Sequence, residues 1–158
     1  MTLKDDLNRA LAELTRSRET PVSLDEQGWA QLVLPMPPGM TKQGGPQLII
    51  EVVLSKTGNY FTLLTPLAVL DGKPSAEFFQ ALLYRQFSAD QVEGGGFGLG
   101  AGGERDRLVA LCHWPLAAIT PEQFSALFRN FVKATLALIR EVKEMARREP
   151  ALVLIYPD

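Results

Sequence analysis

The motif with the clearest chemical meaning lies in residues 94–106, GGGFGLGAGGERD. Gly98 to Gly103 match G-x-G-x-x-G, the pattern that cradles dinucleotide phosphates. That site needs a strand before the glycines and a helix after them, because the phosphates bind amides at the helix N-terminus. Here a helical pattern ends near Phe87 and a strand pattern begins near Arg107. We therefore predict a hairpin, with a short strand at residues 97–99 and a turn at Gly102-Gly103, and no nucleotide site.

Cys112 and His113 are the only cysteine and the only histidine, and they are adjacent. A thiol beside an imidazole could be a nucleophile with its base, but neighbours in a strand point to opposite faces of the sheet. A small core residue is the commoner role of such a cysteine. The serines lack a G-x-S-x-G context, and no second histidine is available for a relay or a metal site. We therefore predict no catalytic residue, no cofactor and no metal.

Composition and charge favour a soluble globular protein. The chain has 158 residues, 46% of them hydrophobic, which fits one domain over 1–158 with an apolar tail at 150–158. A net charge of −2 lacks the basic excess of nucleic-acid binders, and the basic residues at 140–148 alternate with glutamates, as in a solvated helix end. The N-terminus has no signal-peptide pattern, and no apolar run is long enough for a membrane helix. We therefore expect a cytoplasmic protein that binds neither membrane nor nucleic acid directly.

Hydrophobic periodicity and turn residues predict the elements that position these side chains. In chain order we expect a helix over 3–16, strands over 29–37, 47–55 and 60–70, a helix from Ser75 to about Phe87, strands over 97–99 and 107–114, and a helix from about Pro121 to Glu149. This α-β-β-β-α-β-β-α order, with strands joined by short turns, predicts an α+β fold: an antiparallel five-stranded sheet with flanking helices.

The last helix has an apolar arc of roughly a half-circle, wider than the stripe of about 100° that a surface helix needs. At about 28 residues it is roughly 42 Å long, so it should extend beyond strands of about 17–20 Å. We expect a second copy or a client protein to cover this surplus, although three helices and the tail could cover it within one chain. The predicted interface residues are Phe124, Phe128, Phe131, Leu138, Val142, Trp114, Leu154 and Tyr156.

The segments NYFTLLTPLA, GGFGLG and LVALCHWPLAAITPEQFSALFRNFV resemble the YbjN-like proteins, bacterial relatives of the type III secretion chaperones. The resemblance covers roughly residues 3–145. Trp114-Pro115-Leu116 replaces a Leu-Pro-Leu that precedes the long helix in that family, and Tyr84-Arg85-Gln86 and loop 35–46 also depart from its pattern. The resemblance implies the same five-stranded sheet, a dimer, no catalytic residues, and binding of extended client segments or a regulatory role in stress.

Two functions are compatible with these observations. The first is a non-catalytic homodimer that binds other proteins as a chaperone or adaptor. The alternative is a small-molecule-sensing domain with a pocket between helices and sheet, where loops 35–46 and 94–104 act as lids.

Overall fold

The computed structural model describes residues 2–40, 46–86, 95–102, 105–115 and 118–157, with the backbone only for 85, 86, 95–102 and 105. Its elements are, in chain order, α1 (Leu3–Leu14), β1 (Trp29–Leu34), β2 (Leu48–Leu54), β3 (Tyr60–Leu70), α2 (Ala76–Gln86), β4 (Gly95–Gly102), β5 (Arg105–Pro115), α3 (Pro121–Ala146) and β6 (Leu152–Leu154). The α+β class and the order of elements are confirmed. The short strand β6 is an addition, because the sequence pattern left the tail without an element.

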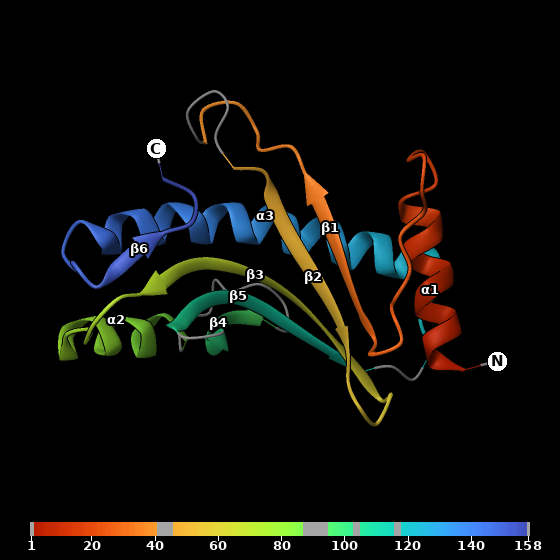
Figure 1. Cartoon of the computed structure of the whole chain (residues 1–158), viewed down its shortest axis with the longest axis horizontal. Coiled ribbons are helices and arrows are strands. Elements are labelled where there is room, and N and C mark those ends of the chain that lie inside the picture. The colour runs from red at the N-terminus through yellow and green to blue at the C-terminus, as the bar shows by residue number, and fades with distance from the viewer. Residues whose placement is uncertain (1, 41–45, 87–94, 103–104, 116–117, 158) are drawn as a thin grey trace.

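The strands form one antiparallel sheet in the order β1-β2-β3-β5-β4. The long strand β3 pairs with β5 along nearly its whole length, from Tyr60 opposite Pro115 to Val69 opposite Arg107. Its other edge is shared, since β2 pairs with residues 61–64 and β6 with residues 68–70. An irregularity between Pro66 and Ala68 separates these two stretches. Figure 1 shows the long curved pair β3–β5, with α3 behind the sheet and α1 at one end.

The glycine-rich segment forms the predicted hairpin. β4 runs antiparallel to β5, with Phe97 opposite Ala110 and Leu99 opposite Leu108. A helix precedes this strand and a strand follows it, so the arrangement of a dinucleotide site is reversed. Gly102 is the last residue of β4, and the expected turn residue Gly103 lies outside the described residues.

Two helices begin with capping boxes that the sequence encodes. The Thr2 side chain accepts a hydrogen bond from the backbone of Asp5, and the Asp5 side chain accepts one from the backbone of Thr2. Thr120 and Gln123 repeat this exchange at α3, with Pro121 in the first turn. Each pair satisfies amides that the first turn of a helix leaves unpaired. These starts are therefore local properties of the sequence.

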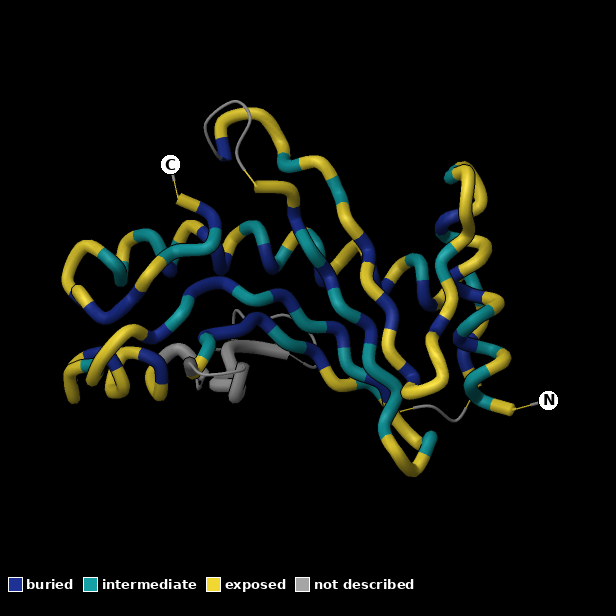
Figure 2. The backbone as a smooth tube through the Cα atoms, in the orientation of Figure 1, coloured by how far each residue is buried: buried dark blue, intermediate teal, exposed yellow. Residues whose placement is uncertain are grey.

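The expectation that the last helix extends beyond its sheet is wrong. α3 has 26 residues, or about 39 Å at 1.5 Å per residue. β3 and β5 have 11 residues each, about 36 Å at 3.3 Å per residue, and not the average strand length assumed from the sequence. The helix is therefore about as long as each of these two strands. Figure 2 shows buried residues along the helix and along the strands. The helix therefore buries its apolar side within its own chain: Phe124, Leu127, Phe128, Phe131, Thr135, Leu138, Ile139 and Val142 are all buried.

The apolar tail completes the core instead of standing free. Leu152 is buried, and β6 pairs with the end of β3. Tyr156 is 2% exposed, and its hydroxyl accepts a hydrogen bond of 3.2 Å from the backbone N–H of Ile49 in β2. Burial raises the pKa of the Tyr156 phenol. The tail thus fills the place where β2 and β3 separate.

The Tyr156 hydroxyl should contribute measurably to stability. Tyr156→Phe keeps the ring in the core but leaves the Ile49 N–H without its acceptor, so we expect a loss of about 1–2 kcal/mol in the free energy of unfolding. Urea denaturation measures this loss. Tyr60→Phe is the matched control, because Tyr60 is 43% exposed at the start of β3. Equal stability of the two variants would contradict the assigned role of the tail.

Candidate protein-binding surfaces

Most of the predicted interface residues lie in the core. Phe124, Phe128, Phe131, Leu138 and Val142 are at most 5% exposed, and Tyr156 is 2% exposed. The expectation that they form an outer surface is wrong, because α1, the strands and the tail cover them. A partner can reach them only if the chain opens. Trp114 and Leu154 are half-buried and remain accessible.

The α2 contact face consists of Phe79, Leu83 and Tyr84, which are 38%, 61% and 71% exposed. They flank Phe78 and Leu82, which are buried, and the ring of Phe79 packs edge-on against that of Phe78 with the centroids 5.4 Å apart. The sequence analysis predicted this helix from its periodicity but did not include these residues among the interface candidates. The adjacent pairs Phe78-Phe79 and Leu82-Leu83 could have predicted exposed apolar residues on this helix. The two pairs are four residues apart, so they form two parallel apolar stripes, and a sheet can cover only one of them.

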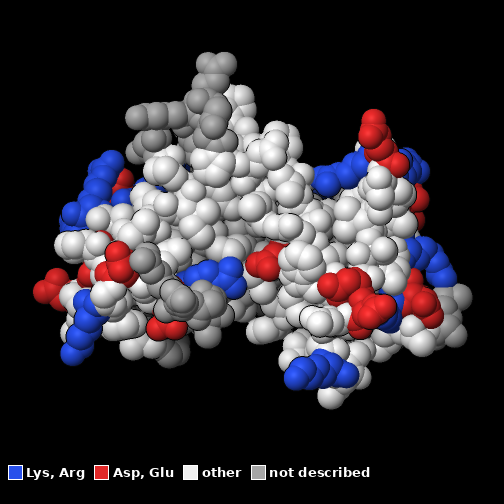
Figure 3. Space-filling model, in the orientation of Figure 1, with Lys and Arg blue, Asp and Glu red and all other residues white. Residues whose placement is uncertain are grey.

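The sheet face opposite α3 carries mostly uncharged side chains, and Figure 3 shows basic and acidic groups among them near the middle of the molecule. Alternate residues of four strands form it, and they are exposed or half-buried: Trp29, Gln31, Val33, Ile49, Glu51, Val53, Tyr60, Thr62, Leu64, Leu111 and His113. Some of its polar groups are paired with one another. Trp29 Nε1 donates to Glu51 at 3.0 Å, and Thr62 Oγ1 lies 2.7 Å from His113 Nδ1. This face therefore mixes apolar side chains with paired polar ones, and Arg107 of β5, on the same face, has a buried Nε without a hydrogen-bond partner.

The free edge of β1 is closed by the segment between α1 and β1. Asp25 hydrogen-bonds both backbone groups of Trp29, through its own N–H and its carboxylate. Arg18 donates to the carbonyl oxygen of Val33 at 2.9 Å. Native sheets cover their edges in this way against pairing with another chain. An added strand at β1 would have to displace these contacts.

Trp114 lines a groove of about 300 Å³ between the end of β5 and the first half of α3. Ile119 and Leu127 form apolar walls, and Gln123 and Asn130 add amides. The groove can hold an apolar side chain and hydrogen-bond a backbone beside it. Among the predicted interface residues, Trp114 is the one that lines a described groove.

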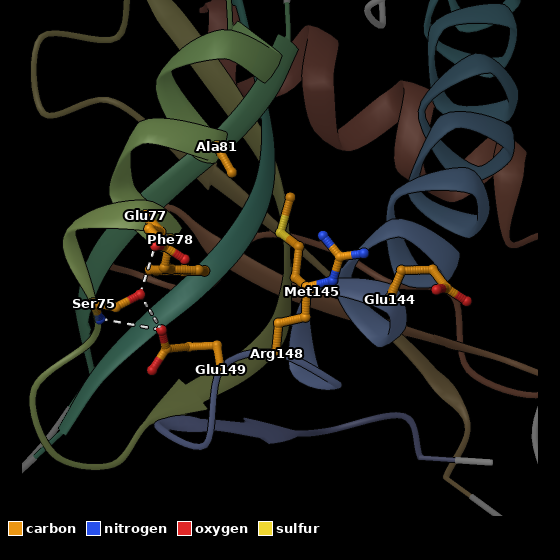
Figure 4. A pocket seen from close by; sticks show the side chains of 8 residues that line it. All are labelled: Ser75, Glu77, Phe78, Ala81, Glu144, Met145, Arg148 and Glu149. Atoms are coloured by element: carbon orange, nitrogen blue, oxygen red, sulfur yellow. Dashed lines mark hydrogen bonds between the residues drawn. The ribbon is translucent and has the colours of Figure 1, made fainter.

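A hollow of about 380 Å³ separates α2 from the end of α3. Phe78 and Ala81 line it from α2, and Met145 and Arg148 from the region of α3 (Figure 4). Glu149 closes one end. A mixed apolar and charged lining of this size is at the lower end of small-molecule sites.

The Glu149 carboxylate is bonded to the start of α2. Its Oε2 accepts hydrogen bonds from the Ser75 hydroxyl at 2.6 Å and the Ser75 N–H at 3.1 Å, and its Oε1 accepts one from the Ala151 N–H at 3.3 Å. The bonds from Ser75 are the main cause that lowers the pKa of Glu149 below its ordinary value. Sequence analysis placed Glu149 at a solvated helix end, but the structure buries it to 6% exposure.

Cys112 and His113 point to opposite faces, as predicted from their positions in one strand. Cys112 is fully buried, whereas His113 is exposed beside Thr62. They do not form a nucleophile and base. In the part of the chain that the structure describes, no group of three or more His, Cys, Asp or Glu residues could hold a metal ion.

The described parts of the loops predicted as lids, 35–46 and 94–104, pack in the sheet or against α3. Residues 95–102 are a sheet strand, so this part of segment 94–104 is no lid. Met40 of loop 35–46 is buried, and its carbonyl oxygen accepts a hydrogen bond from Lys143 Nζ in α3. Residues 41–45, 94, 103 and 104 lie outside the described residues.

The basic residues near the end of α3 differ in their contacts, since Lys143 reaches Met40 whereas Arg147 makes a local pair. Arg147 pairs with Glu144 at 3.2 Å, as expected for a solvated helix end. No helix within the described ranges combines the length and the apolar character needed to span a bilayer.

Comparison with protein-family models and with curated protein sequences finds no match. Two solved structures share the fold. A chain of the crystal structure of the ExsC–ExsE complex aligns with a TM-score of 0.58 at 19% identity, over 89% of this chain and 96% of that one. A chain of the HopA1–SchA chaperone–effector complex aligns with a TM-score of 0.54 at 15% identity, over 87% and 96%. The chain thus shares the fold of these two structures, one of which is a chaperone–effector complex.

Acid should remove the stability that Glu149 contributes. Because the pKa of Glu149 is lowered in the folded state, its contribution is complete above the ordinary carboxyl value of 4.5 and disappears as pH falls through the folded value. The wild type should therefore be more stable than Glu149→Gln at neutral pH, and the difference should shrink below about pH 4.5. Urea denaturation across pH 3–7 measures the difference.

Asp5→Asn is the control, since the pKa of Asp5 is also lowered, by its bonds to Thr2, but Asp5 lies at the start of α1. In the Asp5→Asn variant, the pH-dependent part of the stability that Glu149 contributes should be the same as in the wild type. A wild-type advantage over Glu149→Gln that does not change with pH would contradict the assignment.

Proposed function

We propose that this chain is a non-catalytic protein-binding module that acts as a homodimer, in the manner of a chaperone or adaptor. The observation that carries the proposal is the α2 contact face. Phe79, Leu83 and Tyr84 are exposed apolar side chains on one helix, in a chain whose long helix buries most of its own. Exposed apolar patches of soluble proteins commonly mark sites of protein association.

The α2 contact face is suited to a second copy of the chain. In an interface with twofold symmetry the same patch faces itself, so one apolar helix face is sufficient for both partners. Large aromatic and aliphatic side chains contribute most of the energy in such contacts. The dimer would then leave the sheet face opposite α3 and the Trp114 groove available for a client.

The fold supports a client-binding role. One neighbour is a chaperone–effector complex, and the other is also a complex of two proteins. By analogy, we propose that this chain binds an extended segment of another protein, with Trp114 and Leu154 among the contacts. Membership of the YbjN-like proteins and a role in stress belong to the same proposal and rest on the sequence resemblance. A cytoplasmic location is also part of the proposal but does not rest on that resemblance.

Leu83→Asp tests the homodimer. A carboxylate in the centre of an apolar interface loses its water and meets a second carboxylate across the twofold axis, so the dimer dissociation constant should rise at least about tenfold. Sedimentation velocity from nanomolar to micromolar concentration measures this. Val153→Asp is the control, because Val153 is 46% exposed in β6 and lies outside the α2 contact face. A dimer that tolerates Leu83→Asp would exclude this helix face, and a monomeric wild type would exclude the homodimer.

The hollow between α2 and α3 favours a second candidate function, small-molecule sensing. A ligand that occupies it should raise the melting temperature of the folded chain in a metabolite screen. Ala81→Trp should abolish that increase, because the indole would fill the space that Ala81 now lines. Stabilisation that persists in this variant would place the ligand elsewhere, and a screen without stabilisation would favour protein binding.

A further inference from the structure

Glu149 lies where three elements meet. It follows α3, precedes β6, and bonds the residue before α2. Among the residues that the structure describes, it is the only buried one with a charged side chain. A buried carboxylate is costly unless hydrogen bonds compensate its lost water, so its surroundings must be specific.

A chain of hydrogen bonds joins this carboxylate to the first turn of α2. Ser75 Oγ donates to Glu149 Oε2 at 2.6 Å and accepts from the N–H of Phe78 at 3.1 Å. The Ser75 N–H donates to the same carboxylate oxygen. The first amides of a helix lack partners and carry partial positive charge, so a carboxylate is favourable there. Figure 4 shows the carboxylate of Glu149 beside Ser75, across the hollow from Met145.

The second carboxylate oxygen is bonded to the tail. Glu149 Oε1 accepts from the N–H of Ala151, and the carbonyl oxygen of Ala151 accepts from the N–H of Asp71, which follows β3. One carboxylate therefore fixes the start of α2 relative to the end of α3 and the tail.

We propose that Glu149 is a positioning residue for the α2 contact face, and that the C-terminal tail determines through it how this face meets a partner. The inference rests on the proposed function, in which the face contacts a second copy. The described side chains of α2 include two buried apolar ones, Phe78 and Leu82, while Phe79, Leu83 and Tyr84 face outward. Orientation of the face thus depends on the packing of α2 against β4 and, at the first turn of the helix, on the charged bonds from Ser75 to Glu149.

Loss of the carboxylate should loosen α2 and weaken the dimer, although Glu149 does not touch the partner. If α2 becomes ordered only during association, the conformational entropy lost in that step opposes binding and lowers the affinity. In Glu149→Gln only one of the two terminal atoms can accept, so either the bonds from Ser75 or the bond from Ala151 is lost, and the remaining bonds lose their charge. We expect the dimer dissociation constant to rise about tenfold.

The experiment measures two quantities in the full chain: the dimer dissociation constant by sedimentation, and hydrogen exchange of the amides of α2 and α1. Glu149→Gln should weaken the dimer and speed exchange in α2, with α1 unchanged. Glu144→Gln is the matched control, since Glu144 lines the same hollow and pairs with Arg147 but makes no bond to Ser75. Ser75→Ala should weaken the dimer less, and the double variant should be no weaker than Glu149→Gln alone.

The outcomes separate this inference from the proposed function. A monomeric wild type would overturn the homodimer and, with it, the positioning role. A dimeric wild type with an unchanged dissociation constant in Glu149→Gln would overturn the positioning role alone, whether or not exchange in α2 increases. Equal effects of Glu149→Gln and Glu144→Gln would also overturn it, because only one of these carboxylates bonds α2.

Discussion

The pairing of β3 with β5 is the constraint on which the rest of the structure depends. Eleven residues on each strand give the sheet a long central axis, and α3 has nearly the same length. The strands together with α1 and β6 cover α3, so most of its apolar side is buried in its own chain. The tail adds β6 to the edge of β3 that β2 leaves unpaired. The surfaces left for a partner therefore lie on α2, on the opposite sheet face and at the Trp114 groove.

Local patterns predicted which elements form, but not how they cover one another. The capping residues Thr2 and Thr120, the turn at 56–59 and the alternation in β2 and β3 act within a few residues, so they are readable in the sequence. Strand length depends on pairing between distant segments. The sequence analysis assumed strands of average length, and it therefore wrongly predicted that α3 extends beyond the sheet. The strand β6 was not predicted for the same reason, because its three residues form a strand only by pairing with the free edge of β3.

The candidate surface illustrates the same limit. The pairs Phe78-Phe79 and Leu82-Leu83 predict a helix with apolar residues on two stripes. Both stripes have the same helical spacing, so the sequence does not show which one is buried. Phe78 and Leu82 are buried because of how the helix packs in the folded chain. Glu149 is a parallel case: a glutamate at a helix end is solvated by default, and its burial follows from Ser75, 74 residues away in the sequence. Contacts of this kind have no local signature.

The closed edge of β1 determines which kind of contact is available to a partner on that side of the sheet. Asp25 and Arg18 already occupy backbone groups of Trp29 and Val33, so an extended segment gains few main-chain hydrogen bonds there. The side chains of the same strand, in contrast, present Trp29 and Val33, and the Trp29 indole is paired with Glu51. Burial of these side chains removes little hydration from polar atoms, whereas opening the edge would break bonds already formed. Binding at β1 therefore favours partners that lie across the sheet with apolar side chains over partners that add a strand to it.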